Sequence, residues 1–172
     1  MKKNFGIIGT PIKHSLSPTL HNYWFEKYNI DATYSIIDIK EIELVDIVNK
    51  IKENKLSGIN ITLPYKQKIV PYLDILVNDA KTTSSVNTVY LNDQKTLIGE
   101  NTDVFGLQAG YLKDIANFGR KNLKSLILGA GGVAPSIILA LQKSNLRDIS
   151  LTNRTYEKAL FLKKQFPALS LI

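Results

Sequence analysis

The chain has 172 residues, enough for one ordinary domain or two small ones, and its composition of 44% hydrophobic and 22% charged residues excludes a disordered protein. The absence of cysteine excludes a disulfide framework and a thiolate site and is compatible with a reducing cytoplasm. After the basic residues Lys2 and Lys3 comes only a short apolar run that glycine interrupts, and no run approaches the roughly 20 residues that span a bilayer. We therefore expect an untargeted, cytoplasmic protein with no membrane partner.

The net charge of +7 raises the question of a nucleic-acid partner. Of the 22 basic residues, 19 are lysines and three are arginines, and the lysines are scattered along the chain. Nucleic-acid surfaces usually need clustered cations and bidentate arginine contacts. We therefore expect no nucleic-acid partner, and the positive charge suits a small anionic ligand.

Short apolar runs alternate with helical patterns in the first hundred residues, which predicts an α/β fold with a mixed, mainly parallel sheet. In chain order we expect a strand over 5–8 and then a helix with Ser17 as N-cap and Pro18 as first residue. A strand over 33–39 follows, and after it a helix with Leu44, Ile47, Val48 and Ile51 on one face. The last expected elements are a strand over 58–63 and a hairpin of strands 86–91 and 96–98 around Asn92-Asp93.

A connecting helix is expected over 103–118, closed by Gly119, and a second αβ pattern follows. Its expected elements are a strand over 123–128, a helix over 133–143, a strand over 149–152, a helix over 156–166 and the start of a strand over 169–172. This is one half of a dinucleotide-binding fold. We predict a substrate-binding catalytic domain over 1–103, a connecting helix over 104–122 and a partial Rossmann-type domain over 123–172.

The run Gly129-Ala130-Gly131-Gly132-Val133-Ala134 lies between an expected strand and an expected helix and matches G-x-G-x-x-G/A. The glycines permit a tight turn and let backbone N–H groups approach a pyrophosphate, which the helix N-terminus also attracts. A turn that serves only packing is the alternative, and the strand–turn–helix context favours a dinucleotide cofactor.

The end of the next strand indicates which cofactor. NAD sites usually have an acidic residue there for the ribose hydroxyl, whereas NADP sites accommodate the 2′-phosphate with arginine. Here the sequence is Asn153-Arg154-Thr155, with no carboxylate before Glu157. Arg154 can form a charge-assisted bidentate contact with phosphate, which Asn153 and Thr155 can supplement. We therefore predict NADP.

Polar residues also follow the strands of the first domain, where ligand sites of α/β proteins lie. Ser15 and Ser17 lie next to a helix start and can bind a carboxylate, although Ser17 can also serve only as the N-cap. The other polar residues at strand ends are Asn60, Thr62, Lys66, Asn87 and Asp103. This set suits a polyhydroxylated anionic ligand, but spacing alone does not show that its members converge.

The ordered motifs resemble those of the shikimate dehydrogenases over almost the whole chain. They are Gly9-x-Pro11-Ile12-x-His14-Ser15-x-Ser17-Pro18-x-x-His21-Asn22, Asn60-x-Thr62-x-Pro64-x-Lys66, Val86-Asn87-Thr88, Gly99-x-Asn101-Thr102-Asp103-x-x-Gly106, Gly129-Ala130-Gly131-Gly132 and Asn153-Arg154-Thr155. Members of this family reduce 3-dehydroshikimate to shikimate with NADPH, in aromatic amino-acid biosynthesis.

The resemblance implies a role for each matched residue. Ser15 and Ser17, with Thr62, would bind the substrate carboxylate, and Asn60, Asn87 and Asp103 the ring hydroxyls. Lys66 and Asp103 would form the catalytic pair, because hydride delivery leaves negative charge on an oxygen that a nearby proton donor relieves. His14 and His21 would hold turns or core hydrogen bonds, and no metal is implied.

The sequence departs from the family at two places. Ser84-Ser85 stands where Gly-Ala is usual, which strains Ser84 if its φ is positive. Family members also continue through the second half of the cofactor fold, so we expect a C-terminally truncated chain with impaired activity.

Two alternatives stay open: a short protein that binds a small anion or nucleotide without turnover, and a quinate/shikimate dehydrogenase with relaxed cofactor use. The oligomeric state, a homodimer included, is not fixed by the residues.

Overall fold

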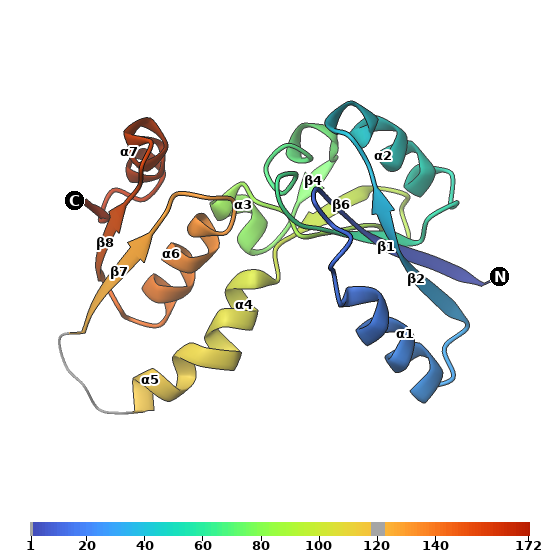
Figure 1. Ribbon diagram of the computed structural model, residues 1–172, viewed down its shortest axis with the longest axis horizontal. Helices are drawn as coiled ribbons and strands as arrows, with labels where there is room; N and C mark the ends of the chain where they lie inside the picture. The colour runs from blue at the N-terminus through green and yellow to red at the C-terminus, as the bar shows by residue number, and fades with distance from the viewer. Residues whose placement is uncertain (1, 118–122) are drawn as a thin grey trace. The chain divides into compact units, whose positions relative to one another are not determined.

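The computed structural model describes residues 2–117 and 123–172, and its chain divides into two compact units, Met1–Asn101 and Thr102–Ile172 (Figure 1). The domain limits expected from the sequence, at 103/104 and 122/123, remain predictions. The expected end of the connecting helix, Phe118 and Gly119, lies outside the described residues. Among the helices of the described ranges, none is both long enough and apolar enough to cross a membrane.

The first unit is built on a six-stranded sheet in the order β2-β1-β3-β5-β6-β4. Its strands are β1 (Lys3–Gly9), β2 (Ala32–Asp38), β3 (Gly58–Ile61), β4 (Ile75–Leu76), β5 (Thr88–Leu91) and β6 (Leu97–Glu100). Strand β1 is parallel to β2 and β3, and β4 is parallel to β6, whereas β5 is antiparallel to both of its neighbours. The predicted mixed, mainly parallel sheet is confirmed, and β4 is a strand that we did not predict.

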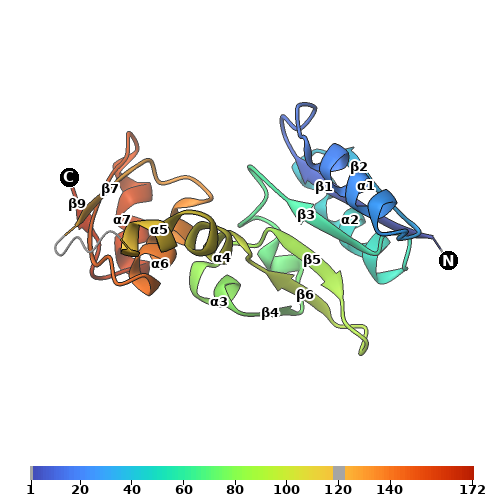
Figure 2. The ribbon, with the colours of Figure 1, turned by 90° about the horizontal axis from the view of Figure 1, so that it is seen from below.

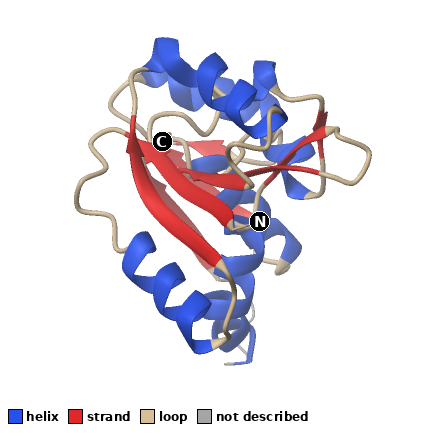
Figure 3. Ribbon diagram, turned by 90° about the vertical axis from the view of Figure 1, so that its right-hand side faces the viewer, coloured by secondary structure: helices blue, strands red, loops and turns tan. Residues whose placement is uncertain are grey.

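Helices α1 (Ser17–Lys27) and α2 (Leu44–Lys52) lie on opposite faces of this sheet (Figure 3). The predicted apolar face of α2 is confirmed, because Leu44, Ile47, Val48 and Ile51 are all buried in the main core of the unit. Helix α1 has no fully buried residue and contacts the sheet through Phe25, whose ring lies 5.8 Å from that of Phe5. Short helical segments occupy Glu41–Glu43, Val70–Tyr72 and α3 (Asp79–Thr83).

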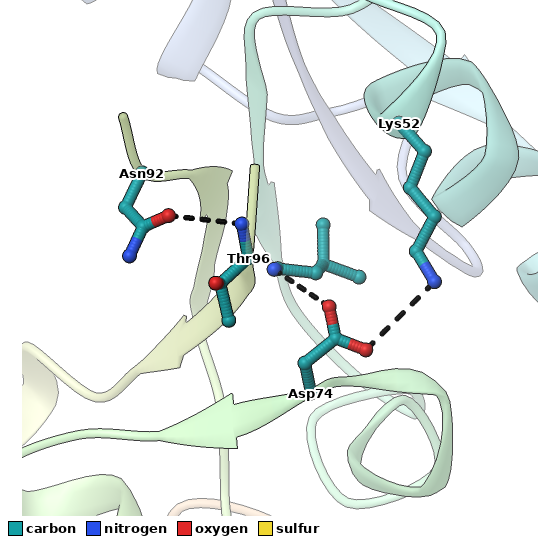
Figure 4. Close-up of polar contacts among 5 residues, drawn as sticks. Lys52, Asp74, Asn92 and Thr96 are labelled. Carbon is teal, nitrogen blue, oxygen red and sulfur yellow. Dashed lines mark hydrogen bonds and ion pairs between the residues drawn. The ribbon is translucent and has the colours of Figure 1, made fainter. Parts of the chain in front are cut away.

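The β5–β6 hairpin lies beside β3 (Figure 2), and side-chain hydrogen bonds fix its turn. The Asn92 Oδ1 atom accepts a hydrogen bond from the Thr96 N–H at 2.9 Å, and the Asp74 carboxylate accepts one from the Leu97 N–H at 2.8 Å (Figure 4). The Lys52 ammonium lies 3.8 Å from the other Asp74 oxygen. The predicted hairpin is therefore confirmed, and its turn runs from Asn92 to Thr96.

The second unit holds the parallel sheet β7-β8-β9. Its chain order is β7 (Lys124–Leu128), α6 (Ala134–Lys143), β8 (Asp148–Thr152), α7 (Tyr156–Gln165) and β9 (Ser170–Leu171). This confirms the predicted βαβαβ arrangement. Ahead of it, α4 (Asp103–Leu107), a π-helical turn (Gln108–Leu112) and α5 (Lys113–Asn117) follow one another, and α4 contacts α6.

The expected strain at Ser84 is confirmed. This exposed serine follows α3 in the left-handed conformation, with φ 47° and ψ 36°, a conformation that favours glycine because a Cβ atom is crowded there.

We expect the Ser84→Gly variant to be more stable than the parent by up to about 1 kcal/mol. The left-handed conformation costs an L-residue roughly 1–2 kcal/mol, and the larger entropy that glycine loses on folding offsets part of the gain. Urea unfolding followed by circular dichroism measures the difference. The Ser84→Ala variant, which keeps the Cβ atom, is the matched control and should not gain stability. A Ser84→Gly variant that is less stable than the parent would contradict this account.

Candidate active site

The loop after β1 carries Ser15 and Ser17. The Ser15 N–H donates to the Ile12 carbonyl at 2.9 Å, and the Ser15 Oγ atom accepts from the Ser17 N–H at 3.3 Å. The expectation that Ser17 is the N-cap was wrong, because Ser17 is the first helical residue and the helix has no side-chain cap. The Ser15 hydroxyl instead contacts the helix N-terminus, and both serines are held beside it.

Thr62 lies directly after β3, against the end of β1. A Cβ atom built on Gly9 would lie 2.5 Å from the Thr62 methyl carbon and 2.9 Å from the Leu63 carbonyl oxygen. The Thr10 N–H donates to that same carbonyl at 2.9 Å. The glycine at position 9 therefore permits the close approach that brings Thr62 to the loop of Ser15 and Ser17.

Asn60 lies in β3 and is hydrogen-bonded on both sides of its amide. Its Oδ1 atom accepts from the Tyr34 hydroxyl at 2.7 Å, and its Nδ2 atom donates to the Asn87 carbonyl and the Thr88 hydroxyl, each at 3.2 Å. The Thr88 hydroxyl donates in turn to the Asn87 Oδ1 atom at 3.0 Å. The structure thus brings the predicted residues Asn60 and Asn87 together.

Tyr34 and Thr88 are absent from the predicted site, although both belong to this hydrogen-bonded group. Tyr34 is only 5% exposed, and burial raises its pKa to about 12, with a smaller opposing effect from a hydrogen bond with the Ser17 side chain. A tyrosine in a strand normally indicates core packing, so no signal in the sequence pointed to it.

Lys66 is half-buried on the segment that follows β3, and its backbone is fixed by its surroundings. Its carbonyl accepts from the Val86 N–H at 2.8 Å. The neighbouring Tyr65 is buried, and its hydroxyl donates to the Ile39 carbonyl at 2.8 Å. Burial also raises the pKa of Tyr65.

Asp103 belongs to the second unit, as the first residue of α4. It lines a cavity of about 420 Å³ together with Thr102, Gly106, Leu107, Val133, Ser136 and Ile137. The predicted catalytic residue thus shares a cavity with Val133 of the glycine-rich turn. Its pairing with Lys66 of the first unit remains a prediction.

The glycine-rich turn joins β7 to α6. Gly129 has a φ of 108°, which only glycine adopts readily, and its N–H donates to the Thr152 carbonyl at 2.8 Å. A Cβ atom on Gly131 would point into open space. Pro135 lies in the first turn of α6, where its missing N–H costs little. The turn therefore leaves room for a ligand at the start of α6.

Asn153 links this turn to the segment that carries Arg154. Its Oδ1 atom accepts from the Ala130 N–H at 2.9 Å, and its Nδ2 atom donates to the Thr155 carbonyl at 2.6 Å. Arg154 and Thr155 are exposed just before α7. Lys158, which we did not predict, adds an exposed cation in the first turn of that helix.

The described parts of the chain hold no cluster of three or more His, Cys, Asp or Glu side chains arranged to bind a metal ion.

Two families match the chain. The shikimate dehydrogenase substrate-binding domain matches residues 7–89, and the shikimate/quinate 5-dehydrogenase family matches residues 112–171. The NADP(+) shikimate dehydrogenase of Pelagibacter ubique is 51% identical over 174 aligned residues, which cover 100% of this chain. The chain belongs to the shikimate dehydrogenase family. The corresponding protein of Lysinibacillus sphaericus is 40% identical and covers 92% of the chain.

Solved shikimate dehydrogenases share the fold. The Aquifex aeolicus enzyme matches with a TM-score of 0.85 and 36% identity, over 99% of this chain and 62% of that one. The Thermus thermophilus enzyme in complex with NADP(H) and shikimate matches with a TM-score of 0.81 and 31% identity, over 99% and 62%. This chain spans 64% and 57% of the lengths of the Pelagibacter and Lysinibacillus relatives.

The environment of His21 predicts a pH dependence of stability. Its ring stacks on Tyr34 at 4.2 Å, and burial lowers its pKa below the ordinary value of 6.5. Because the folded state disfavours the charged ring, this contribution to stability is present above pH 6.5 and is lost as the pH falls through the lowered pKa. Between about pH 7.5 and about pH 5, which spans the histidine range, the His21→Phe variant should therefore lose less free energy of unfolding than the parent.

Denaturant unfolding at the two pH values measures this difference. The same substitution at the exposed His14 is the control for replacing a histidine with an apolar ring. An unchanged pH dependence in the His21→Phe variant would exclude the histidine as its source.

Proposed function

We propose that this protein is an NADP-dependent oxidoreductase that interconverts 3-dehydroshikimate and shikimate. The observation that carries the proposal is the cavity of about 420 Å³ that Asp103 and Val133 line at the start of α6. It puts a residue expected to act on the substrate next to the turn expected to hold the cofactor. The membership in the shikimate dehydrogenase family supports the same reaction.

In the first unit, the residue types suit a hydroxylated ring acid. Ser15 and Ser17, beside the N-terminus of α1, are proposed to bind the carboxylate together with Thr62. Asn60 and Asn87 are proposed to bind ring hydroxyls. The hydrogen bonds of Asn60 leave one lone pair of its Oδ1 atom for this purpose, since both of its N–H groups donate within the protein.

In the second unit, the residues fit NADP. The positive φ of Gly129 and the open space at Gly131 let backbone N–H groups approach a pyrophosphate. Arg154 is proposed to bind the 2′-phosphate, on a segment that Asn153 ties to the glycine-rich turn. Thr155 is proposed to add a hydrogen bond. When bound, the reduced cofactor supplies the hydride that the ketone carbon receives.

Lys66 is proposed to donate a proton to the ketone oxygen as negative charge develops there, and to accept it in the reverse direction. Asp103 is proposed to orient the ammonium group and a substrate hydroxyl. The hydrogen bond from the Val86 N–H to the Lys66 carbonyl fixes the backbone that carries this group. A cytoplasmic location, expected from the composition, and a homodimer also belong to this proposal.

The reaction is tested by shikimate-dependent formation of NADPH. We expect the Lys66→Ala variant to lower kcat by roughly 10²–10⁴, the range for loss of a general acid–base group. The control is Lys68→Ala, two residues away, because Lys68 pairs with Glu41 at the surface. Equal loss in both variants would contradict the role of Lys66. A folded protein that binds shikimate and NADP without turnover would agree both with the impaired activity expected above and with the non-catalytic binding protein, and it would leave the binding residues as proposed.

The cofactor preference is tested at Arg154. We expect Arg154→Gln to raise the Kd for NADP by roughly ten- to a hundredfold, the loss of a charge-assisted hydrogen bond, and to change the Kd for NAD little. Arg147 precedes β8 at its amino end, whereas Arg154 follows the carboxyl end of the same strand, so Arg147→Gln is the matched control. Parallel weakening of NADP and NAD by Arg154→Gln would favour relaxed cofactor use.

A further inference from the structure

A chain of side-chain hydrogen bonds crosses the face of the first sheet that α1 covers. It runs from the Tyr34 hydroxyl to Asn60 Oδ1 at 2.7 Å, from Asn60 Nδ2 to the Thr88 hydroxyl at 3.2 Å, and from that hydroxyl to Asn87 Oδ1 at 3.0 Å. Tyr34 lies in β2, Asn60 in β3 and Thr88 in β5, so the chain passes over β1. We call these four residues the Tyr34 network.

The direction of each bond in the Tyr34 network is determined by a backbone group. The Asn87 carbonyl can only accept, and it lies 3.2 Å from the Asn60 amide, so this side of the amide must be the Nδ2 donor. The Oδ1 atom then faces Tyr34, whose hydroxyl must donate. The single hydroxyl proton of Tyr34 is therefore donated to Asn60.

Helix α1 holds Tyr34 in this position. The Asn22 side chain donates to the Tyr34 carbonyl and accepts from the Tyr34 N–H, both at 2.9 Å. Because β2 is an edge strand, this amide supplies the backbone partners that a further strand would otherwise supply. The His21 ring stacks on the Tyr34 ring with an interplanar angle of 9°. The motif residues His21 and Asn22 thus act on Tyr34.

We propose that Tyr34 is a positioning residue of the substrate site. Its hydroxyl holds the Oδ1 atom of Asn60, the side chain that is proposed to bind a ring hydroxyl of the substrate. This inference rests on the proposed function, because it assigns Tyr34 to a shikimate site. It assigns Tyr34 no contact with the substrate, and it predicts that the orientation of the Asn60 amide depends on the phenol oxygen of Tyr34.

The Tyr34→Phe variant removes this oxygen and keeps the ring that stacks on His21. We expect the Kd for shikimate to rise about three- to tenfold, the effect of one hydrogen bond, with no change in the Kd for NADP. Titration calorimetry with each ligand measures both constants on the same protein. The matched control is Tyr90→Phe, because Tyr90 lines the same cavity of about 250 Å³ as Tyr34 and Asn60 but lies outside the Tyr34 network. It should leave both constants as in the parent.

A double-mutant cycle with Asn60→Ala tests whether Tyr34 acts through its partner. We expect the effect of Tyr34→Phe on the shikimate Kd to be smaller in the Asn60→Ala background than in the parent, because coupled residues give non-additive effects. Fully additive effects would overturn the action through Asn60. The thermal unfolding midpoints of all variants are measured alongside the affinities. If both Tyr34→Phe and Tyr90→Phe lose shikimate affinity in proportion to a lowered midpoint, the positioning role is overturned.

Two further outcomes separate this inference from the proposed function. Shikimate binding that is the same in Tyr34→Phe and Tyr90→Phe overturns the inference and leaves the function intact. A parent protein that binds NADP but no shikimate overturns the proposed function and the assignment of Tyr34 to a shikimate site. In that case NMR spectra test whether the Tyr34 hydroxyl positions the Asn60 side chain. Side-chain amide signals of Asn60 that are the same in the parent and in Tyr34→Phe would overturn this positioning as well.

Discussion

The backbone of Asn87 is hydrogen-bonded on both sides. Its carbonyl accepts from the Ile61 N–H at 2.9 Å, and its N–H donates to the Glu100 carbonyl at 3.0 Å. These two bonds start the antiparallel strand β5 between β3 and β6, and they bring the beginning of one strand to the carboxyl ends of its neighbours. Without this change of direction, Asn87 would lie at the far edge of the sheet from Thr62, and the polar residues of the first unit would not gather at one edge.

Much of this fold follows from periodicity in the sequence. The apolar face of α2 and the βαβαβ pattern after residue 123 are strong repeats, and both are confirmed. The strand β4 has only two residues, Ile75 and Leu76, so it leaves no alternation to detect. The N-cap was misplaced because Ser17 precedes a proline, and the sequence does not reveal that the Ser15 hydroxyl already accepts from the Ser17 N–H.

The candidate site could be predicted only in part, for a topological reason. Motif spacing identified Asn60 and Asn87, but it does not give the strand order β2-β1-β3, which places Tyr34 across β1 from Asn60. A buried tyrosine in an alternating strand has the same pattern whether its hydroxyl is used or not. Likewise, Asn153 was predicted as a cofactor ligand, whereas its amide also connects the glycine-rich turn to the next segment through Ala130.

The π-helical turn Gln108–Leu112 interrupts what would otherwise be one α-helix between Asp103 and Asn117. A π-helical hydrogen bond spans one residue more than an α-helical one, so such a turn accommodates one extra residue. In evolutionary terms, this is a place where the chain can lengthen or shorten by a single residue. The residues on either side, including Val104 in the core of the second unit and Ile115 packed against that core, would keep their neighbours through such a change. A natural length variant would therefore be easiest to accommodate here, one turn away from Asp103.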